Sequence, residues 1–328
     1  MFESPSSPQL ANASSEPRQA LHTFPPPTIF PPLRQPHNQT IIFLHGRGSS
    51  ARIFAPDLLD TSVAGLETDD GSKSLRESLP NTRFVFPTAP RSRATIYRRS
   101  IINQWFDGSG DWEETVLGHA KETIEFLHRL LREEVLLVGG ADRVFLGGFS
   151  QGCATALVCM LLWEGDSLGG IVGMCGMLPM GGDLREILRQ GDSGPEGLDY
   201  HGTRQERNVD IEEDFLEPTD DDTWDPFSHE EDSSQATPLI QALDLLREEI
   251  GFPRLESNSE PRVHEIPVFL GHGTEDDNVL LRYAEDASSV LQMAGCEVIF
   301  KKYEGLGHCH SPQMLRDILE FLAREKVC

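Results

Sequence analysis

Ser150 is the residue whose surroundings most clearly suggest chemistry. It lies in Gly148-Phe-Ser-Gln-Gly152, a G-x-S-x-G pattern, between the short apolar run 143–146 and the helix-length apolar run 153–162. A strand, a tight turn and a buried helix in that order make this pattern a nucleophile elbow. Glycine is needed on both sides because a Cβ would clash with the strand or the helix. The pattern therefore predicts that Ser150 is a nucleophile.

A serine nucleophile needs a base to take its proton and an acid to orient that base. Around such elbows the chain order is serine, then acid, then histidine, each at the end of a strand. After Ser150, the apolar run 266–270 leads directly into Glu275, Asp276 and Asp277. The position predicts that one of these three acids is the partner and leaves the choice among them open.

The histidine should follow the last strand. His308 does so, directly after the Gly-x-Gly loop 305–307, and His310 is its rival. His272 comes one residue after an apolar run, and we expect it to be structural, with its ring bonded to nearby backbone. The order of the three groups favours His308 as the base.

Two backbone N–H groups should stabilise the oxyanion formed by attack on a carbonyl. One is expected from Gln151, the residue after the nucleophile, and the other from a loop after an early strand. The run Phe43-Leu-His-Gly-Arg-Gly48 is such a loop, because an apolar run ends in glycines that let backbone approach a substrate. His45 is expected to stabilise this loop.

Apolar runs of strand length recur along the chain with helical periods between them. Runs that are apolar on both faces indicate a sheet buried on both sides, and so a parallel α/β architecture. The expected strands are 40–44, 83–86, 143–146, 170–175, 266–270 and 297–300. The expected helices are 119–132, 238–250, 278–294 and 311–327.

The 328-residue chain carries a net charge of −25, which argues against nucleic acid or an anionic membrane as partner. No apolar run reaches the length of a membrane span, and the N-terminus lacks the pattern of a secretory signal. The six cysteines are scattered, as reduced thiols are. We therefore expect a cytoplasmic protein without a transmembrane segment.

Two segments differ in composition from the rest. Residues 1–23 lack periodicity and are expected to be disordered, and the Pro-rich stretch 24–36 fits either a ligand for a partner or an extended edge segment. Residues 192–232 hold 16 acidic residues against two arginines and are expected to form a disordered insert in a single domain spanning 24–328. The insert fits a solvated loop, a docking tract or a gating loop.

Taken together and in order, these motifs resemble the phospholipase/carboxylesterase family, which includes the acyl-protein thioesterases. The resemblance covers about 24–182 and 236–325. It is carried by Phe43–Gly48, Pro87-Thr-Ala-Pro90, Trp105-Phe-Asp107, Gly147–Gly152, His272-Gly with Asp276, and Tyr303-Glu-Gly305 with His308. It implies an α/β-hydrolase fold, with a mostly parallel central sheet and helices on both faces.

The resemblance also assigns roles. It selects Asp276 over its neighbours and His308 over His310, and it implies Arg47 and Gln151 as the backbone oxyanion donors. It implies hydrolysis of esters and thioesters, including S-palmitoyl cysteine on proteins, with no cofactor and no metal. Trp105 and the stretch 91–99, with Arg98 and Arg99, correspond to the substrate-binding region.

The chain departs from the family at several positions. Cys153 replaces a usual glycine, Asp277 a usual proline and Arg47 a common leucine. Four arginines in 91–99 stand where the family forms its acyl-binding lid. If they face the groove they favour a short or anionic acyl group; otherwise they face solvent or pair with the acidic insert.

The sequence thus predicts a serine hydrolase most like an acyl-protein thioesterase, acting on an acylated protein. A second hypothesis is a carboxylesterase for small-molecule esters with short or anionic acyl groups. A third, of another class, is an inactive scaffold that docks partners on the acidic insert or the Pro-rich segment. The filled triad positions argue against the third.

Overall fold

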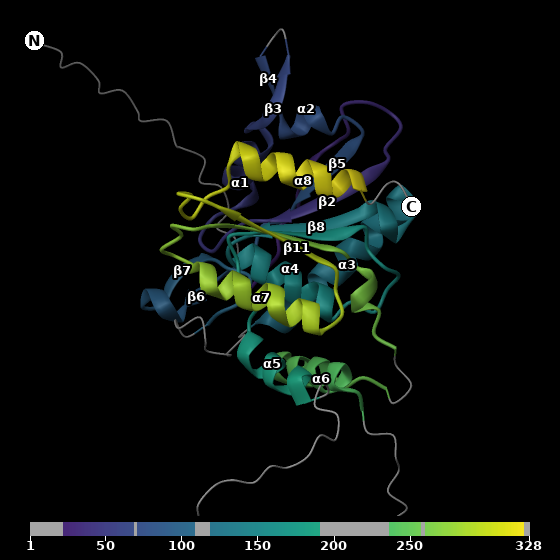
Figure 1. The fold of residues 1–328 in the computed structure, drawn as a ribbon, viewed down its shortest axis with the longest axis vertical. Helices are drawn as coiled ribbons and strands as arrows, with labels where there is room; N and C mark the ends of the chain where they lie inside the picture. Colours follow the sequence, from purple (N-terminus) through teal and green to yellow (C-terminus); the bar gives the residue numbers. More distant parts are fainter. Residues whose placement is uncertain (1–21, 69–70, 109–118, 191–235, 257–259, 325–328) are drawn as a thin grey trace, which may run out of the picture.

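The fold is built on one sheet whose strands are ordered β1-β5-β2-β8-β9-β10-β11 (Figure 1). The computed structural model describes residues 22–68, 71–108, 119–190, 236–256 and 260–324. Neighbours pair in parallel from β5 to β11, and β1 alone pairs antiparallel, with β5. The strands are β1 Thr28–Phe30, β2 Gln39–Leu44, β5 Thr82–Phe86, β8 Val144–Phe149, β9 Gly170–Met174, β10 Val268–Gly273 and β11 Val298–Tyr303.

The expected parallel α/β architecture is confirmed, and each of the six predicted strands lies in this sheet. The Pro-rich stretch supplies β1, so it forms an extended edge strand beside β5. That placement suits proline, which cannot donate to a ladder and is tolerated at sheet edges. The predicted tail over 1–23 lies almost entirely, and the acidic insert 192–232 entirely, outside the described residues.

Helices cover both faces of the sheet. In β2, Ile41 and Phe43 belong to one core cluster and Ile42 and Leu44 to the other, as alternation along a strand requires. Helices α1 Ala51–Leu59 and α8 Pro312–Arg324 cover the first face. Helices α3 Ala120–Val138, α4 Gln151–Leu161 and α7 Leu281–Met293 cover the second (Figure 1).

The predicted helices are present, with ends shifted by a few residues for α3, α7 and α8. Helix α6 spans Pro238–Ile250, the predicted range, and Thr237 caps it by accepting a hydrogen bond from the Ile240 N–H at 3.3 Å. It packs with α5 Gly181–Gln190 as a further layer beyond α7 (Figure 1).

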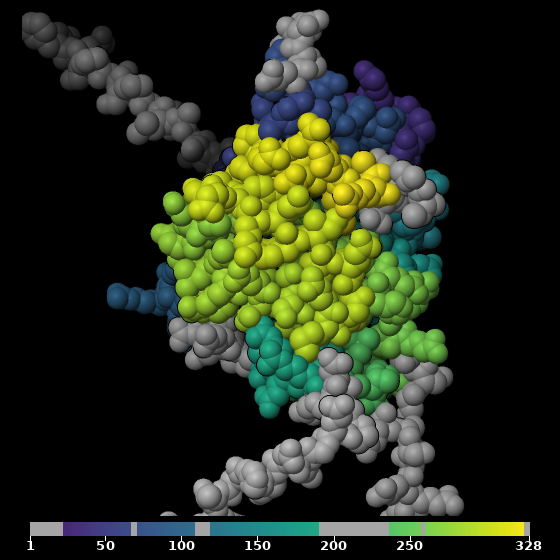
Figure 2. Space-filling view, in the orientation of Figure 1, coloured from purple at the N-terminus to yellow at the C-terminus, as the bar shows by residue number. Residues whose placement is uncertain are grey.

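Two hairpins and several short elements complete the described chain. Strands β3 Ser62–Thr68 and β4 Gly71–Ser74 pair antiparallel, and α2 Leu75–Ser78 follows them. Strands β6 Arg91–Ala94 and β7 Ser100–Asn103 pair antiparallel around the 3₁₀ turn η1 Thr95–Tyr97. The β6–β7 hairpin projects from the edge of the molecule in both views (Figures 1 and 2). The short turns η2 Ala141–Arg143 and η3 Val263–Glu265 precede β8 and β10.

This topology places the predicted chemistry on one edge. Parallel strands end at the same side of a sheet, so the loops after β2, β8, β10 and β11 gather there. Those four loops carry His45, Ser150, Asp276 and His308 respectively.

Candidate active site

Ser150 lies at the sharp turn from β8 into α4. Its backbone has φ +55° and ψ −120°, a conformation that costs a non-glycine residue energy and that recurs at functional sites. Its N–H is bonded to the Met174 carbonyl at 2.9 Å. A Cβ on Gly148 would overlap the backbone of Gly152, and one on Gly152 would overlap the Leu44 carbonyl. Both glycines are therefore required for the turn.

The serine opens onto a cavity of about 520 Å³. His308 lines the same cavity, and its ring packs against Phe149 with ring centroids 4.8 Å apart. The rest of the lining joins the loop after β2 to α1 and to the loop after β11: Gly46, Arg47, Ser49, Ile53, Phe54, Asp57, Thr61, Cys309 and His310. The cavity brings the predicted nucleophile and the predicted base into one space.

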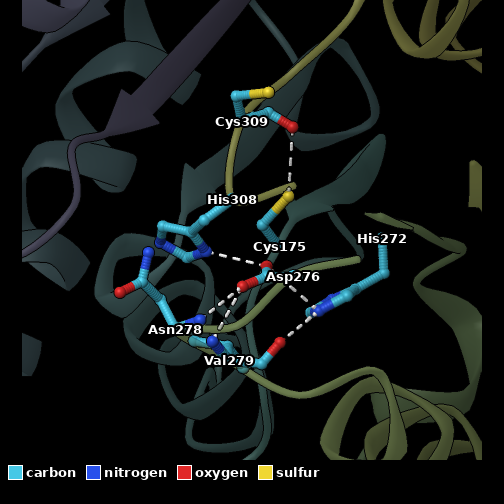
Figure 3. A network of polar contacts seen from close by, with 7 residues as sticks. All are labelled: Cys175, His272, Asp276, Asn278, Val279, His308 and Cys309. Atoms are coloured by element: carbon cyan, nitrogen blue, oxygen red, sulfur yellow. Dashed lines mark hydrogen bonds and ion pairs between the residues drawn. The ribbon is translucent and has the colours of Figure 1, made fainter. Parts of the chain in front are cut away.

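Asp276 orients the His308 ring through a hydrogen bond. The Nδ1–H of His308 donates to Oδ2 of Asp276 at 2.7 Å (Figure 3). The other carboxylate oxygen accepts from the N–H groups of Asn278 at 3.0 Å and Val279 at 2.8 Å. This arrangement fixes the Nδ1–H tautomer and leaves Nε2 as the acceptor that a serine hydroxyl requires.

Hydrogen bonding decides the charge of Asp276. Burial by itself would raise the pKa of this carboxyl, whose side chain is fully buried. The hydrogen bonds from His272, His308 and the Val279 N–H outweigh burial and hold the pKa of Asp276 well below its usual range. The acid is therefore ionised at neutral pH.

His272 supports this carboxylate from the side opposite His308. Its Nε2–H points to the Val279 carbonyl at 2.7 Å and lies 3.3 Å from Asp276 Oδ2 (Figure 3). The ring is buried, with 1% of its side chain exposed. The expectation that His272 bonds to nearby backbone matches this geometry.

The rival residues do not take part in the bond between Asp276 and His308. Glu275 and Asp277 are exposed, and Asp276 is the acid of the three that contacts His308. His310 contacts Thr61, with 3.2 Å between Nε2 and Oγ1, and lies 3.9 Å from Asp57. Burial lowers the pKa of His310, so its ring is neutral where it lines the cavity.

The loop after β2 is held rigidly beside the serine. A Cβ on Gly46 would lie 3.4 Å from the Ser150 Cβ, so backbone approaches the nucleophile here. The ring of His45 donates from Nδ1 to the Gly46 carbonyl at 2.7 Å and accepts from the Ala89 N–H at 3.0 Å. Burial lowers the pKa of His45 to about 4, so the ring is neutral.

Gln151 ties the elbow to the loop after β7. Its side chain accepts from the Trp105 N–H at 3.1 Å and donates to the Phe106 carbonyl at 2.8 Å. The Trp105 indole N–H in turn donates to the His45 carbonyl at 2.7 Å. The two residues predicted to supply oxyanion donors, Arg47 and Gln151, are thus held in adjoining, cross-linked backbone.

The predicted substrate-binding residues are placed differently from one another. Trp105 is fully buried, contacts the loop after β2 through the His45 carbonyl, and lies outside the cavity lining. Arg98 and Arg99 are exposed in the β6–β7 hairpin, both with positive φ, and also lie outside that lining. Arg47 does line the cavity with its neighbour Ser49.

The sequence prediction missed α1, which supplies three lining residues, Ile53, Phe54 and Asp57. The signal was present, since Ser50 precedes an apolar i, i+4 pair, Phe54 and Leu58, directly after the glycine loop. Pro56 within the helix obscured it.

Larger hollows lie elsewhere and lack this chemistry. One of about 670 Å³ and one of about 560 Å³ lie around Arg247, whose guanidinium pairs with Glu164 at 2.7 Å. Neither is lined by a serine. Within the described residues, no helix is long and apolar enough to cross a bilayer.

The strand order and the strand-end loops define an α/β-hydrolase. The chain belongs to the phospholipase/carboxylesterase family, whose sequence model matches residues 29–191 and 252–325. The gap between the two matched segments contains the acidic insert.

Several relatives are named acyl-protein thioesterase 1. The one from Yarrowia lipolytica is 30% identical over 163 residues, which span 48% of this chain and 64% of that protein. The one from Cryptococcus neoformans is 23% identical over 311 residues, covering 88% of this chain and 93% of that protein.

Solved structures share the fold. SOBER1 from Arabidopsis thaliana matches with a TM-score of 0.56 and 21% identity, over 88% of this chain and 99% of that one. Acyl-protein thioesterase 2 from Zea mays matches with a TM-score of 0.53 and 20% identity, over 91% and 98%. At these identities the likeness establishes the architecture.

Proposed function

We propose that this chain is a serine hydrolase that cleaves carboxylic esters or thioesters through an acyl-enzyme. The observation that carries the proposal is the shared cavity of Ser150 and His308, with His308 bonded to buried Asp276 at 2.7 Å. An activated nucleophile is recognised by this relation of hydroxyl, base and orienting acid.

In the proposed mechanism His308 Nε2 accepts the Ser150 proton as the hydroxyl oxygen attacks the acyl carbonyl. Asp276, ionised and fixed by the backbone N–H groups of Asn278 and Val279, stabilises the imidazolium. The backbone N–H groups of Arg47 and Gln151 stabilise the oxyanion. His308 then protonates the leaving alcohol or thiol, and water releases the acid by the reverse sequence.

The proposed substrate is an S-acylated protein. The support is the family and the relatives named acyl-protein thioesterase, two of which align over most of both chains. We place the enzyme in the cytoplasm, where S-acylated cysteines of peripheral proteins are found. The scattered cysteines agree with a reducing compartment.

A second candidate is a small-molecule carboxylesterase with a short or anionic acyl preference. The observation that favours it is the polar lining of the cavity, in which Arg47, Asp57 and Thr61 lie near the apolar Phe54 and Phe149. A long acyl chain would have to desolvate these groups, which costs free energy. A scaffold that docks partners on the acidic insert or the Pro-rich segment would not need Ser150, Asp276 and His308. The presence of all three residues therefore argues against a scaffold role.

A labelling experiment tests the reaction class, and a substrate panel tests the rest. A fluorophosphonate probe should label the wild type and Ser100→Ala, a control on exposed β7, but not Ser150→Ala. Equal labelling of all three would refute a Ser150 nucleophile. Hydrolysis of p-nitrophenyl esters from acetyl to palmitoyl, beside a palmitoyl-peptide thioester, then decides between the two substrate classes.

A further inference from the structure

A buried thiol lies against the proposed catalytic acid and base. Cys175 follows β9 directly, has φ +49° and is fully buried. Its Sγ–H donates to the Cys309 carbonyl at 3.3 Å, in the loop that carries His308 (Figure 3). The mechanism assigns nothing to this thiol.

The three side chains form one set of ligating atoms. Cys175 Sγ, a carboxylate oxygen of Asp276 and a ring nitrogen of His308 all lie within 4.8 Å of one another. Thiolate, imidazole and carboxylate are the side chains that bind Zn²⁺, at about 2.0–2.3 Å. Neighbouring ligand atoms of a tetrahedral ion are then about 3.5 Å apart. Side-chain shifts on the order of an ångström would therefore bring the three ligand atoms to coordination distance.

We propose that Cys175, Asp276 and His308 bind a zinc ion that reversibly inhibits the enzyme. The fourth coordination position of the zinc ion would be open to water from the cavity, since His308 and Cys309 line that cavity. Two of the three ligands belong to the proposed triad, so the inhibition rests on the proposed function, whereas the binding does not.

The coordination step accounts for each proton. Zinc takes the place of the proton on His308 Nδ1, which moves through solvent to Nε2, and the Cys175 thiol releases its proton to water. No electron is transferred. His308 then carries a proton on Nε2, the atom that must accept from Ser150, so attack on an ester stops. Chelation of the ion restores the resting tautomer.

The structure offers a matched control in Cys309. It adjoins His308 in sequence and is exposed, but in Figure 3 its thiol lies on the far side of its own carbonyl, away from Asp276. Cys309→Ser therefore removes a nearby thiol without removing a proposed ligand. Cys175→Ser keeps a hydrogen-bond donor to the Cys309 carbonyl and removes the sulfur.

The experiment titrates untagged, full-length protein with Zn²⁺ by calorimetry and follows ester hydrolysis in parallel. Wild type and Cys309→Ser should bind one zinc ion and lose activity at the same concentration, with recovery on adding EDTA. Cys175→Ser should weaken binding at least tenfold and resist inhibition to the same extent. Co²⁺ should give a thiolate charge-transfer band with wild type and Cys309→Ser but not with Cys175→Ser.

The outcomes separate the two proposals. Unchanged zinc affinity in Cys175→Ser, loss of affinity in Cys309→Ser, or no uptake by the wild type overturns the zinc site. If no ester is hydrolysed, the proposed function fails while calorimetry and the cobalt band still decide the site. If circular dichroism shows that Cys175→Ser does not fold, the cobalt charge-transfer band decides instead. Absence of the band in the wild type refutes Cys175 as a ligand. Loss of the band in Cys175→Ala, with the band retained in Cys309→Ser, supports Cys175 as a ligand.

Discussion

The indole N–H of Trp105 donates to the backbone carbonyl of His45 at 2.7 Å, with the two rings 5.0 Å apart. This bond crosses sixty residues of chain and connects the loop after β7 to the loop after β2. Because His45 directly precedes Gly46 and Arg47, the indole fixes the backbone that is proposed to bind the oxyanion. Trp105 is thus a positioning residue beneath the site.

Replacing Trp105 with phenylalanine should lower kcat rather than raise KM. The variant keeps an aromatic ring in the core but leaves the buried His45 carbonyl without its donor, which costs about 1–3 kcal/mol. If about 1.4 kcal/mol of that cost falls on the proposed oxyanion loop in the transition state, kcat drops about tenfold. Steady-state kinetics on one soluble ester check this, and a rise in KM at constant kcat would instead indicate direct contact with substrate.

His45 should make the fold sensitive to mild acid. Burial lowers the pKa of His45 in the folded chain to about 4, from an ordinary value near 6.5. Between these two pH values the His45 ring is protonated in the unfolded chain but neutral in the folded chain. Stability from this group is therefore complete above pH 6.5 and is lost as pH falls toward 4. Between pH 7 and pH 5 the loss is about 2 kcal/mol.

Urea unfolding of wild type and His45→Gln at pH 7 and pH 5 measures this contribution. The variant should be less stable at pH 7 but should lose about 2 kcal/mol less than the wild type on acidification. Other buried histidines affect both proteins equally, so the difference isolates His45. Identical losses in the two proteins would assign the acid sensitivity to other groups.

Asp276→Asn should reduce kcat by about 10⁴-fold, while Asp277→Asn should leave it within about threefold. The carboxamide carries no charge to stabilise the imidazolium of His308, and the exposed Asp277 is the matched control. His308→Ala and His310→Ala form a second pair with the same expected contrast. A larger loss in either control than in its partner would reverse the assignment.

The sequence was sufficient for the features that depend on order along the chain. Six apolar runs predicted the strands, and the loops after β8, β10 and β11 carry Ser150, Asp276 and His308 because parallel strands end together. The spacing in 275–277 could not by itself separate three acids; burial of the middle one beside His308 does so in space.

What the sequence could not supply were contacts between distant segments. Nothing in the periodicity around Trp105 indicates that its indole reaches the His45 carbonyl rather than the substrate cavity. The arginines of the β6–β7 hairpin and Arg47 are equally charged in the sequence, and only the fold distinguishes the exposed ones from the one in the cavity. In the β3–β4 hairpin the apolar residues Val63 and Leu66 are separated by small residues, so no continuous apolar run indicated a strand.

Deleting residues 192–232 and bridging the gap with a short Gly/Ser linker should leave kcat on a soluble ester nearly unchanged. The two segments matched by the family model stop before and resume after this stretch, and α5 and α6 on either side of it pack together. Long surface insertions cost little in loop entropy. Loss of folded protein, or a large loss of kcat, would show that the insert belongs to the domain.

If the second candidate function is right, Arg47 should limit acyl-chain length, and the hairpin arginines should not. Arg47 lines the cavity with Ser150, and burial lowers the pKa of its guanidinium while Tyr97 and Asp107 oppose that effect. A charge in this position disfavours a long apolar chain. Arg47→Leu keeps the backbone N–H proposed for the oxyanion.

The measurement is the ratio of kcat/KM for octanoyl over butyryl p-nitrophenyl esters. We expect Arg47→Leu to raise it about tenfold, equivalent to roughly 1.4 kcal/mol, and Arg98→Ala with Arg99→Ala to leave it unchanged, since both side chains are exposed. High salt should change the wild-type ratio little, because partly buried charges are weakly screened. A shift in the hairpin variant alone would move the selectivity to the β6–β7 hairpin, and a wild type that prefers palmitoyl over butyryl would refute a polar acyl site.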